Sequence, residues 1–331
     1  MIGLPWLEDA GAQLRQQYRQ QRLPHGLLLS GGAGLGVDRF VQWLEAVLLC
    51  QHAEQAPCGT CHSCELRLAG NHADSLTLSP EGKGQQIKVD MVRELVGFSQ
   101  GRPQHSHNKV VVLKSADRLN MAAANALLKV LEEPPAGTYL VLQTEEPAQL
   151  LPTIRSRLQW FRCPVPAAQE GLAWLQGQGL TAEQAELALA LSDQQPCRAL
   201  EMADDSYLEL RETCLNQLLG QLEKPRRDLQ GPETLSRQEP KVVLDIWRPW
   251  LADLATLVQT GDTGRVRNRD QVAQLQALVA RYPQPALWMQ IHDDAEALRE
   301  QVASGNNLNW QLLLEQFWLS IPKIMKRAQQ E

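Results

Sequence analysis

The first half of the chain alternates short apolar runs with amphipathic stretches. The apolar runs have the length of buried strands, and they predict strands over 26–30, 75–79, 109–113, 139–143 and 158–163. Between them, apolar residues recur at helical spacing and predict helices over 38–49, 90–99 and 122–132. Pro134 and Pro135 end the last of these helices. Strands that alternate with helices indicate a parallel α/β sheet with right-handed crossovers.

Beyond residue 163 the pattern is helical only. Pro164 and Pro166 suggest a linker, and three short helices are predicted over 167–175, 181–192 and 196–203. Thr181 with Gln184 three residues later has the form of a capping box. Long amphipathic helices are then predicted over 208–222, 233–259, 269–281, 284–304 and 310–327. We therefore expect three domains: an α/β domain over 1–165, a small helical domain over 166–205 and an all-α domain over 206–331.

Charge and composition argue against several classes of protein. The 331 residues are 44% hydrophobic, which is enough to form buried cores. Residues 1–165 hold 16 Lys+Arg and 15 Asp+Glu, a net charge of +1, whereas residues 166–331 hold 16 and 23, a net charge of -7. This acidic balance argues against a chain that binds nucleic acid by itself. The chain has no signal-peptide pattern and no apolar run of the roughly 18 residues that span a bilayer, so we expect a soluble cytoplasmic protein with no membrane partner.

A glycine-rich loop follows the first predicted strand and precedes a helix. This is the layout of a phosphate-binding loop, whose pattern is G-x-x-x-x-G-K-[ST]. Gly31 and Gly36 match the glycines, but Val37 and Asp38 replace the lysine and the hydroxyl residue. After the strand over 109–113, where a Mg²⁺-binding carboxylate is expected, the chain has Lys114 and Ser115. The sequence predicts an ATPase scaffold without ATPase activity, and the alternative is a glycine-rich turn unrelated to nucleotides.

Four of the seven cysteines lie close together in the sequence. They are Cys50, Cys58, Cys61 and Cys64, whereas Cys163, Cys197 and Cys214 are scattered and resemble ordinary buried thiols. The spacing C-x7-C-x2-C-x2-C allows four thiolates to complete a tetrahedral Zn²⁺ shell of structural type, in an insertion over about 50–64. An iron–sulfur cluster is the competing interpretation, but Leu68 stands where the fourth cysteine of a ferredoxin run would follow.

Together these motifs resemble a known family. The stretches that carry the resemblance are 24–36, the four clustered cysteines, 109–120, 124–135 (ANALLKVLEEPP), 140–147 and 150–159. They resemble AAA+ clamp-loader proteins, in particular the delta-prime family of bacterial DNA polymerase III subunits. The resemblance implies an AAA+ α/β domain, similar to P-loop NTPases, followed by a helical lid domain and a helical collar domain.

The resemblance also implies partners. Members of this family work in a five-subunit ring with gamma/tau and delta subunits, which opens the sliding clamp and places it on primed DNA. The ring is part of the DNA polymerase III holoenzyme, a nucleotidyltransferase complex. We therefore expect the chain to contact the clamp and primed DNA only through that assembly, with its last domain holding partner subunits.

An arginine supplied in trans is the functional residue that the resemblance implies. The family places it in a T-x-x-S-R-C segment, which corresponds here to Thr153, Ser156 and Arg157, with Leu158 in place of the cysteine. A guanidinium presented to the γ-phosphate of a neighbouring ATP site would offset charge that develops in the transition state. The alternative for Arg157 is an ion pair with a local carboxylate.

The remaining family positions favour a subunit that binds no ATP. Thr144 corresponds to the first sensor, and Cys197 stands where the second-sensor arginine is expected, with Arg198 displaced by one residue. Two other classes stay open: an active AAA+ ATPase with an atypical loop, and a zinc-containing nucleic-acid-binding protein. The second lacks basic flanks, because the charged residues beside the cysteines are Glu54 and Glu65.

Overall fold

The structure is a computed structural model that describes residues 2–80, 86–303 and 309–328. The chain divides into two compact units. One comprises Met1–Trp174 with Gln195–Arg198, and the other comprises Leu175–Gln194 with Ala199–Glu331. The division into three domains at 165/166 and 205/206 stays a prediction.

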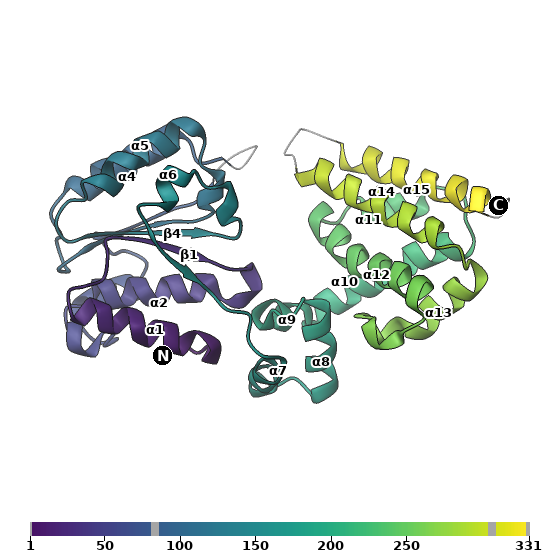
Figure 1. Ribbon diagram of the computed structural model, residues 1–331, viewed down its shortest axis with the longest axis horizontal. Coiled ribbons are helices and arrows are strands. Elements are labelled where there is room, and N and C mark those ends of the chain that lie inside the picture. The colour runs from purple at the N-terminus through teal and green to yellow at the C-terminus, as the bar shows by residue number, and fades with distance from the viewer. Residues whose placement is uncertain (1, 81–85, 304–308, 329–331) are drawn as a thin grey trace. The chain divides into compact units, whose positions relative to one another are not determined.

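A five-stranded parallel sheet forms the centre of the first unit (Figure 1). Its strand order is β2-β3-β4-β1-β5. The strands are β1 (Gly26–Ser30), β2 (Ser75–Leu78), β3 (Lys109–Leu113), β4 (Thr138–Thr144) and β5 (Gln159–Arg162). Every residue of β1 and β3 is buried, as the continuous apolar runs predict for strands of a parallel sheet covered on both faces.

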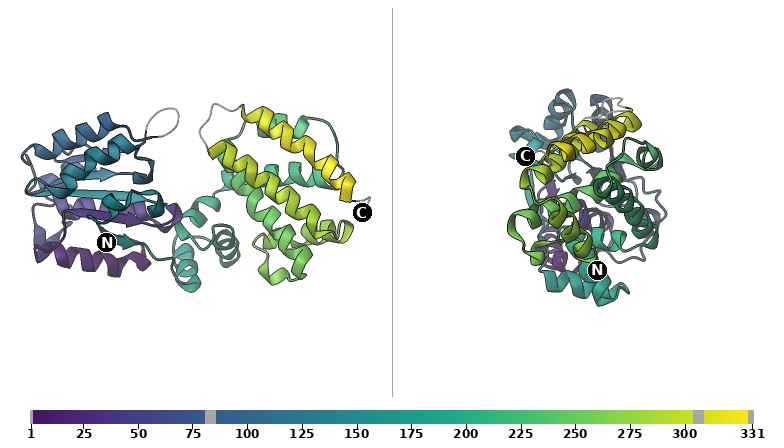
Figure 2. Two further views of the ribbon diagram at one scale, coloured as in Figure 1. Left: turned by 45° about the horizontal axis from the view of Figure 1, so that its top comes forward. Right: turned by 90° about the vertical axis from the view of Figure 1, so that its right-hand side faces the viewer.

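Helices cover both faces of this sheet. They are α1 (Pro5–Arg19), α2 (Val37–Leu49), α4 (Val89–Gln100) and α5 (Met121–Glu132). In Figure 1 and the left view of Figure 2, α1 and α2 lie on one side of the sheet and α4 and α5 on the other. Leu28, Val111 and Leu140 of the strands share a buried core with Leu95 of α4 and Leu127 of α5. The α/β fold class predicted for the first half is therefore confirmed.

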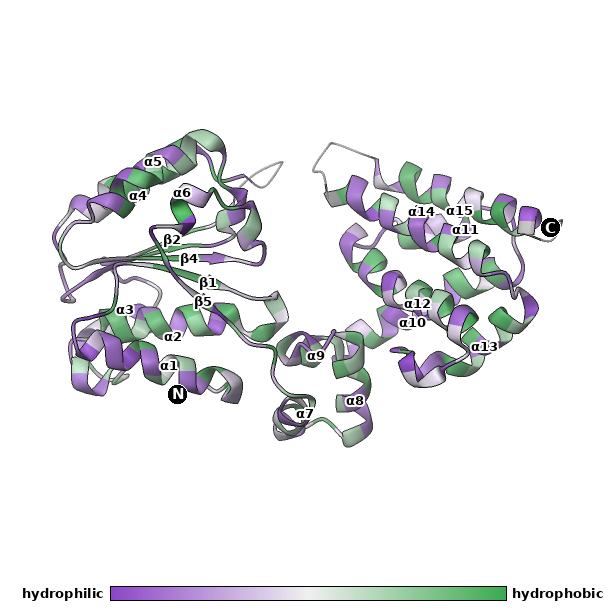
Figure 3. Cartoon of the chain, in the orientation of Figure 1, coloured by the Kyte–Doolittle hydropathy of each residue, from purple (hydrophilic) through white to green (hydrophobic). Residues whose placement is uncertain are grey.

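After β5, the described residues form helices and loops and no strand, as the pattern predicts. The helices are α7 (Ala168–Gly177), α8 (Ala182–Leu191), α9 (Pro196–Met202), α10 (Asp205–Glu223), α11 (Gln230–Leu235), α12 (Pro240–Thr260), α13 (Val272–Arg281), α14 (Pro285–Ala303) and α15 (Trp310–Ala328). Trp247, Trp250 and Trp288 are fully buried in the core of the second unit. Apolar and polar residues alternate around these helices (Figure 3). None of the helices in the described ranges is long and apolar enough to cross a membrane.

The predicted elements and the structure differ in a few places. Helix α1 was not among the predicted elements, and the predicted helix 233–259 is interrupted after Leu235. Pro240 occupies the first turn of α12, where its missing N–H costs nothing, so the break falls just before it. The capping box at Thr181 and Gln184 is confirmed in both directions. Residue 304, the end of the predicted helix 284–304, lies outside the described residues.

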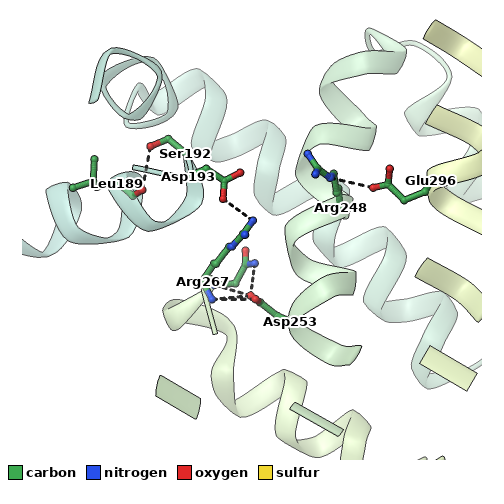
Figure 4. Close-up of polar contacts among 8 residues, drawn as sticks. Leu189, Ser192, Asp193, Arg248, Asp253, Arg267 and Glu296 are labelled. Carbon is green, nitrogen blue, oxygen red and sulfur yellow. Dashed lines mark hydrogen bonds and ion pairs between the residues drawn. The ribbon is translucent and has the colours of Figure 1, made fainter. Parts of the chain in front are cut away.

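A buried carboxylate organises one end of the second unit (Figure 4). Asp253 of α12 is 3% exposed and accepts hydrogen bonds from the backbone N–H groups of Arg267 and Asn268, at 2.8–3.1 Å, and from Asn268 Nδ2 at 2.7 Å. The Arg267 guanidinium then pairs with Asp193, which follows α8, at 2.8 Å. The segment between α12 and α13 is thus fixed to two other parts of the unit.

Replacing this carboxylate tests how much the second unit depends on it. We expect Asp253→Ala to lower the free energy of unfolding by about 2–3 kcal/mol, because it leaves buried N–H groups without acceptors. Asp262→Ala is the control: Asp262 is exposed and accepts from Gly264 N–H, so its loss should cost less than about 1 kcal/mol. Urea denaturation measures both, and equal losses in the two variants would contradict the prediction.

Candidate metal centre and glycine loop

The four clustered cysteines converge in space. Cys50 ends α2, Cys58 lies in the following loop, and Cys61 and Cys64 begin α3 (His62–Leu68). Their Sγ atoms all lie within 4.8 Å of one another, and those of Cys58 and Cys64 are 4.0 Å apart. A tetrahedral set of thiolates with bonds of about 2.3 Å needs sulfurs about 3.8 Å apart, so this donor set fits one metal ion. Helix α3 starts directly after Cys61.

Hydrogen bonds and burial shift the pKa values of three of the four thiols in different directions. Backbone N–H groups donate to sulfur, with His52 N to Cys50 Sγ at 3.4 Å and Cys61 N to Cys58 Sγ at 3.4 Å. Hydrogen bonding, foremost from the Thr60 backbone, lowers the pKa of Cys58 to about 5. Burial raises the pKa of Cys64 to about 12 and also raises that of Cys50. A bound cation would stabilise the thiolate form of all four, since thiolates are the metal-binding form.

A buried hydrogen-bond chain supports the cysteine loop. The Nδ1 atom of His72 accepts from Asp74 N–H at 3.1 Å, so Nε2 carries the proton and donates to Ser63 Oγ at 2.6 Å. The Ser63 hydroxyl donates in turn to the carbonyl of Leu49 at 2.5 Å. Leu49 precedes Cys50 and Ser63 precedes Cys64. The chain therefore fixes two cysteine-bearing segments relative to each other.

Asp74 connects this chain to the loop before β3. Its carboxylate is fully buried and accepts from the backbone N–H groups of Gln104, His105 and Ser106 at 2.6–2.8 Å. Burial alone would raise the pKa of Asp74, but these donors outweigh it and hold the pKa below its ordinary value. Sequence reasoning missed both His72 and Asp74, because neither belongs to a recognisable motif.

The glycine loop joins β1 to α2 at the carboxyl ends of the strands. Gly36 has a φ of +80°, and the side chain of Leu4 fills the space that a Cβ at this position would need. Glycine is therefore required at position 36 for two reasons. The backbone N–H of Gly34 donates to Gln195 Oε1 at 3.2 Å, although 161 positions separate these residues in the sequence.

A substituted position of the phosphate-loop pattern, Asp38, contacts the residue at the expected Mg²⁺-carboxylate position, Lys114. Asp38 lies in the first turn of α2, and Lys114 directly follows β3. Lys114 Nζ lies 2.7 Å from Asp38 Oδ1, and both side chains are partly exposed. Val37 is 1% exposed and belongs to the core. The sequence identified each substitution but did not predict their pairing.

Thr144, the expected first sensor, lies beside the glycine loop. It ends β4 and is in register with Ser30, the last residue of β1. Its hydroxyl donates to the carboxylate of Asp117, and it accepts from Glu146 N–H at 3.0 Å. Asp117 is a further acidic residue at this edge of the sheet that the motifs did not reveal, because it lies four residues beyond the end of β3.

Arg157 lies at the opposite end of the strands from the glycine loop. It precedes β5, whose first residue, Gln159, is in register with Leu27 of β1. Since β1 and β5 are parallel, Arg157 is near the amino ends of the strands and the glycine loop is at their carboxyl ends. The four residues of β5 separate the two sites by about 13 Å of strand. Arg157 therefore cannot serve the glycine loop of its own chain.

A short ion pair holds the Arg157 guanidinium. It lies 2.6 Å from Glu132, the last residue of α5, and also donates to the carbonyl of Thr153 at 2.8 Å. Ser156 Oγ donates to the same carbonyl at 3.0 Å. The ion pair that was the alternative interpretation for Arg157 is thus present. It joins the end of the 124–135 stretch to the 150–159 stretch. The Arg157 side chain remains 35% exposed.

Comparisons with known proteins agree with these motifs. A family model described as "DNA polymerase III, delta subunit" matches residues 6–166, and one described as "DNA polymerase III, delta subunit, C terminal" matches residues 205–322. Among solved structures, the chain is similar to a gamma subunit-related protein of DNA polymerase III from Thermotoga maritima, with a TM-score of 0.44 and 19% identity over 96% of this chain and 99% of that one.

Curated relatives give a consistent answer over nearly the whole length. The chain is 34% identical to the DNA polymerase III subunit delta' of Pseudomonas aeruginosa, over 96% of this chain and 98% of that protein. It is also 34% identical to the protein of that name from Escherichia coli, over 96% and 94%. The Haemophilus influenzae protein is 38% identical over 64% and 65%. The chain therefore belongs to the delta-prime family of DNA polymerase III subunits.

Proposed function

We propose that this subunit acts in the clamp loader of DNA polymerase III without hydrolysing ATP itself. In this role it joins gamma/tau and delta subunits in a five-membered ring and helps place the sliding clamp on primed DNA. Family membership supports the assembly. The absence of a lysine at position 37 and of a hydroxyl at position 38 supports the lack of hydrolysis, because these groups bind the phosphates and Mg²⁺ in active loops.

The proposed contribution of the chain to catalysis is Arg157, presented to the ATP site of the neighbouring subunit with Ser156 beside it. The location of Arg157 supports this role most directly. The guanidinium lies at the amino ends of the strands, opposite to the glycine loop, and remains partly exposed. An arginine there can act only on a site outside its own chain. The Glu132 carboxylate would hold the guanidinium until the neighbour's γ-phosphate competes for it.

The three-domain organisation is part of the same proposal. The two family models leave residues 167–204 between their matched ranges, which supports a small lid region between an α/β domain and a collar. The large apolar core formed by α10, α12, α14 and α15 supports a collar that is stable enough to hold partner subunits.

We also propose that Cys50, Cys58, Cys61 and Cys64 hold a structural zinc ion. Four sulfurs within 4.8 Å suit one ion, whereas an iron–sulfur cluster places its own iron and sulfide atoms between the cysteines and separates them further. Because protein ligands would fill all four positions, the ion would stabilise the loop and take no part in catalysis.

The arginine role is tested in the reconstituted loader. We expect Arg157→Ala to remove hydrolysis at one ATP site, by about 10³-fold or more at that site, and so to lower total clamp-stimulated ATP hydrolysis by the share of that site. Steady-state phosphate release measures this.

Two variants serve as matched controls. Arg155→Ala removes a neighbouring cation of the same segment, and Glu132→Gln breaks the ion pair while keeping the arginine. Both should hydrolyse ATP at close to the wild-type rate. Arg157→Ala loaders that hydrolyse ATP as fast as wild type would exclude the assignment.

The zinc proposal is tested on the full chain. We expect one zinc per purified chain by elemental analysis, and we expect Cys61→Ser to lose the metal and to melt about 5–10 °C lower, since structural metal binding is coupled to folding. Cys197→Ser, outside the cluster, is the control and should keep its zinc. A chelator that removes the metal without changing the melting temperature would contradict a stabilising role, and iron in place of zinc would contradict the identity of the metal.

A further inference from the structure

We propose that side chains of this protein occupy its glycine loop: Gln195 takes the place of a phosphate, and the Asp38–Lys114 pair takes the place of Mg²⁺ and its carboxylate ligand. This inference rests on the proposed function as a subunit that does not hydrolyse ATP. It goes further because it states why the loop stays closed and predicts a hidden anion site beneath these side chains.

An ion pair occupies the position where an active loop would bind Mg²⁺. In an active loop of this kind, the residue at position 38 supplies a hydroxyl and the residue after β3 supplies a carboxylate, and both bind Mg²⁺. Here the second residue is itself a cation, and its Nζ lies 2.7 Å from the carboxylate of the first. A direct contact of this length leaves no space for a metal ion between the two groups. The ammonium of Lys114 thus neutralises the position where Mg²⁺ would lie.

The side chain of Gln195 occupies the glycine loop itself. Its Oε1 accepts the hydrogen bond from Gly34 N–H, a backbone donor of the type that binds phosphate oxygens. A Cβ built on Gly32 would lie 3.0 Å from Gln195 Oε1, and one on Gly34 would lie 2.7 Å from Gln195 Cβ. The glycines therefore admit the Gln195 side chain at close range, as they would admit a phosphate. The neutral amide oxygen satisfies the donor without bringing a charge.

Space for a small anion remains next to these groups. A hollow of about 570 Å³ is lined by Gly31, Gly32 and Gln195, together with the cation of Arg162 on β5 and the carboxylate of Glu145. Shortening Gln195 would join the space at Gly34 to this hollow. Removing the Asp38 carboxylate would leave Lys114, which contacts the first turn of α2, without its anion. The two changes together should convert the closed loop into a site for an inorganic phosphate or pyrophosphate.

The test uses the full-length chain and inorganic pyrophosphate without added metal. We expect Asp38→Ala/Gln195→Ala to bind pyrophosphate at millimolar concentrations, seen as broadening of its ³¹P resonance and as a rise in melting temperature of about 2–4 °C at several times the dissociation constant. The wild-type chain should show neither effect. The control adds Lys114→Ala to the double variant, which removes the cation and should abolish binding.

The outcomes separate the two proposals. Pyrophosphate binding by the wild-type chain, or a folded double variant that binds none, would overturn the occupied loop. Asp38→Asn/Gln195→Ser, which keeps polar groups at both positions, replaces the double variant if circular dichroism shows that the alanine form is unfolded. Binding of Mg²⁺–ATP by the wild-type chain at micromolar concentrations would instead overturn the proposed function. No ATP binding by the wild-type chain together with no pyrophosphate binding by the folded variant would leave the function intact and refute only this inference.

Discussion

The buried strand β1 is the element on which the geometry of both candidate sites depends. It lies between β4 and β5, runs parallel to both, and has every residue buried. A parallel strand with both faces covered can be satisfied only by apolar side chains and by ladder hydrogen bonds to two neighbours. Its burial therefore fixes the register on each side. The glycine loop must then follow β1 at the carboxyl ends of the strands, and Arg157 must precede β5 at their amino ends.

Helix α2 connects the glycine loop to the cysteine cluster. It begins with Val37 and Asp38 at the glycine loop and ends at Cys50, about 20 Å away by the rise of a 13-residue helix. Nine of its residues are buried, so its position is set by the core and not by either loop. The hydrogen-bond chain from Leu49 through Ser63 to His72 then fixes the far end of the helix to the segment before β2. The two sites therefore share one rigid support.

The sequence predicts much of this arrangement and misses what depends on distant contacts. Continuous apolar runs identify β1 and β3 most clearly, because a fully buried strand needs no polar alternation, whereas the edge strands β2 and β5 are partly exposed and mix polar with apolar residues. Helix α1 is not predicted because only Trp6, Leu7 and Leu14 form its buried apolar face, among many polar residues. The cysteine spacing indicates a metal site on its own, since all four ligands are close in the chain. The Asp38–Lys114 pair spans 76 positions and the Gly34–Gln195 bond spans 161, so no local pattern could reveal either contact.

The ion pair between Asp38 and Lys114 couples the two positions to each other. A hydroxyl at position 38 alone would leave the Lys114 ammonium without its carboxylate partner. A carboxylate at position 114 alone would place two carboxylates in contact, which repel each other. Each single change is thus worse than the present pair, and only a simultaneous change at both positions avoids an unpaired charge. Because each residue compensates the charge of the other, substitutions at positions 38 and 114 are best tolerated together.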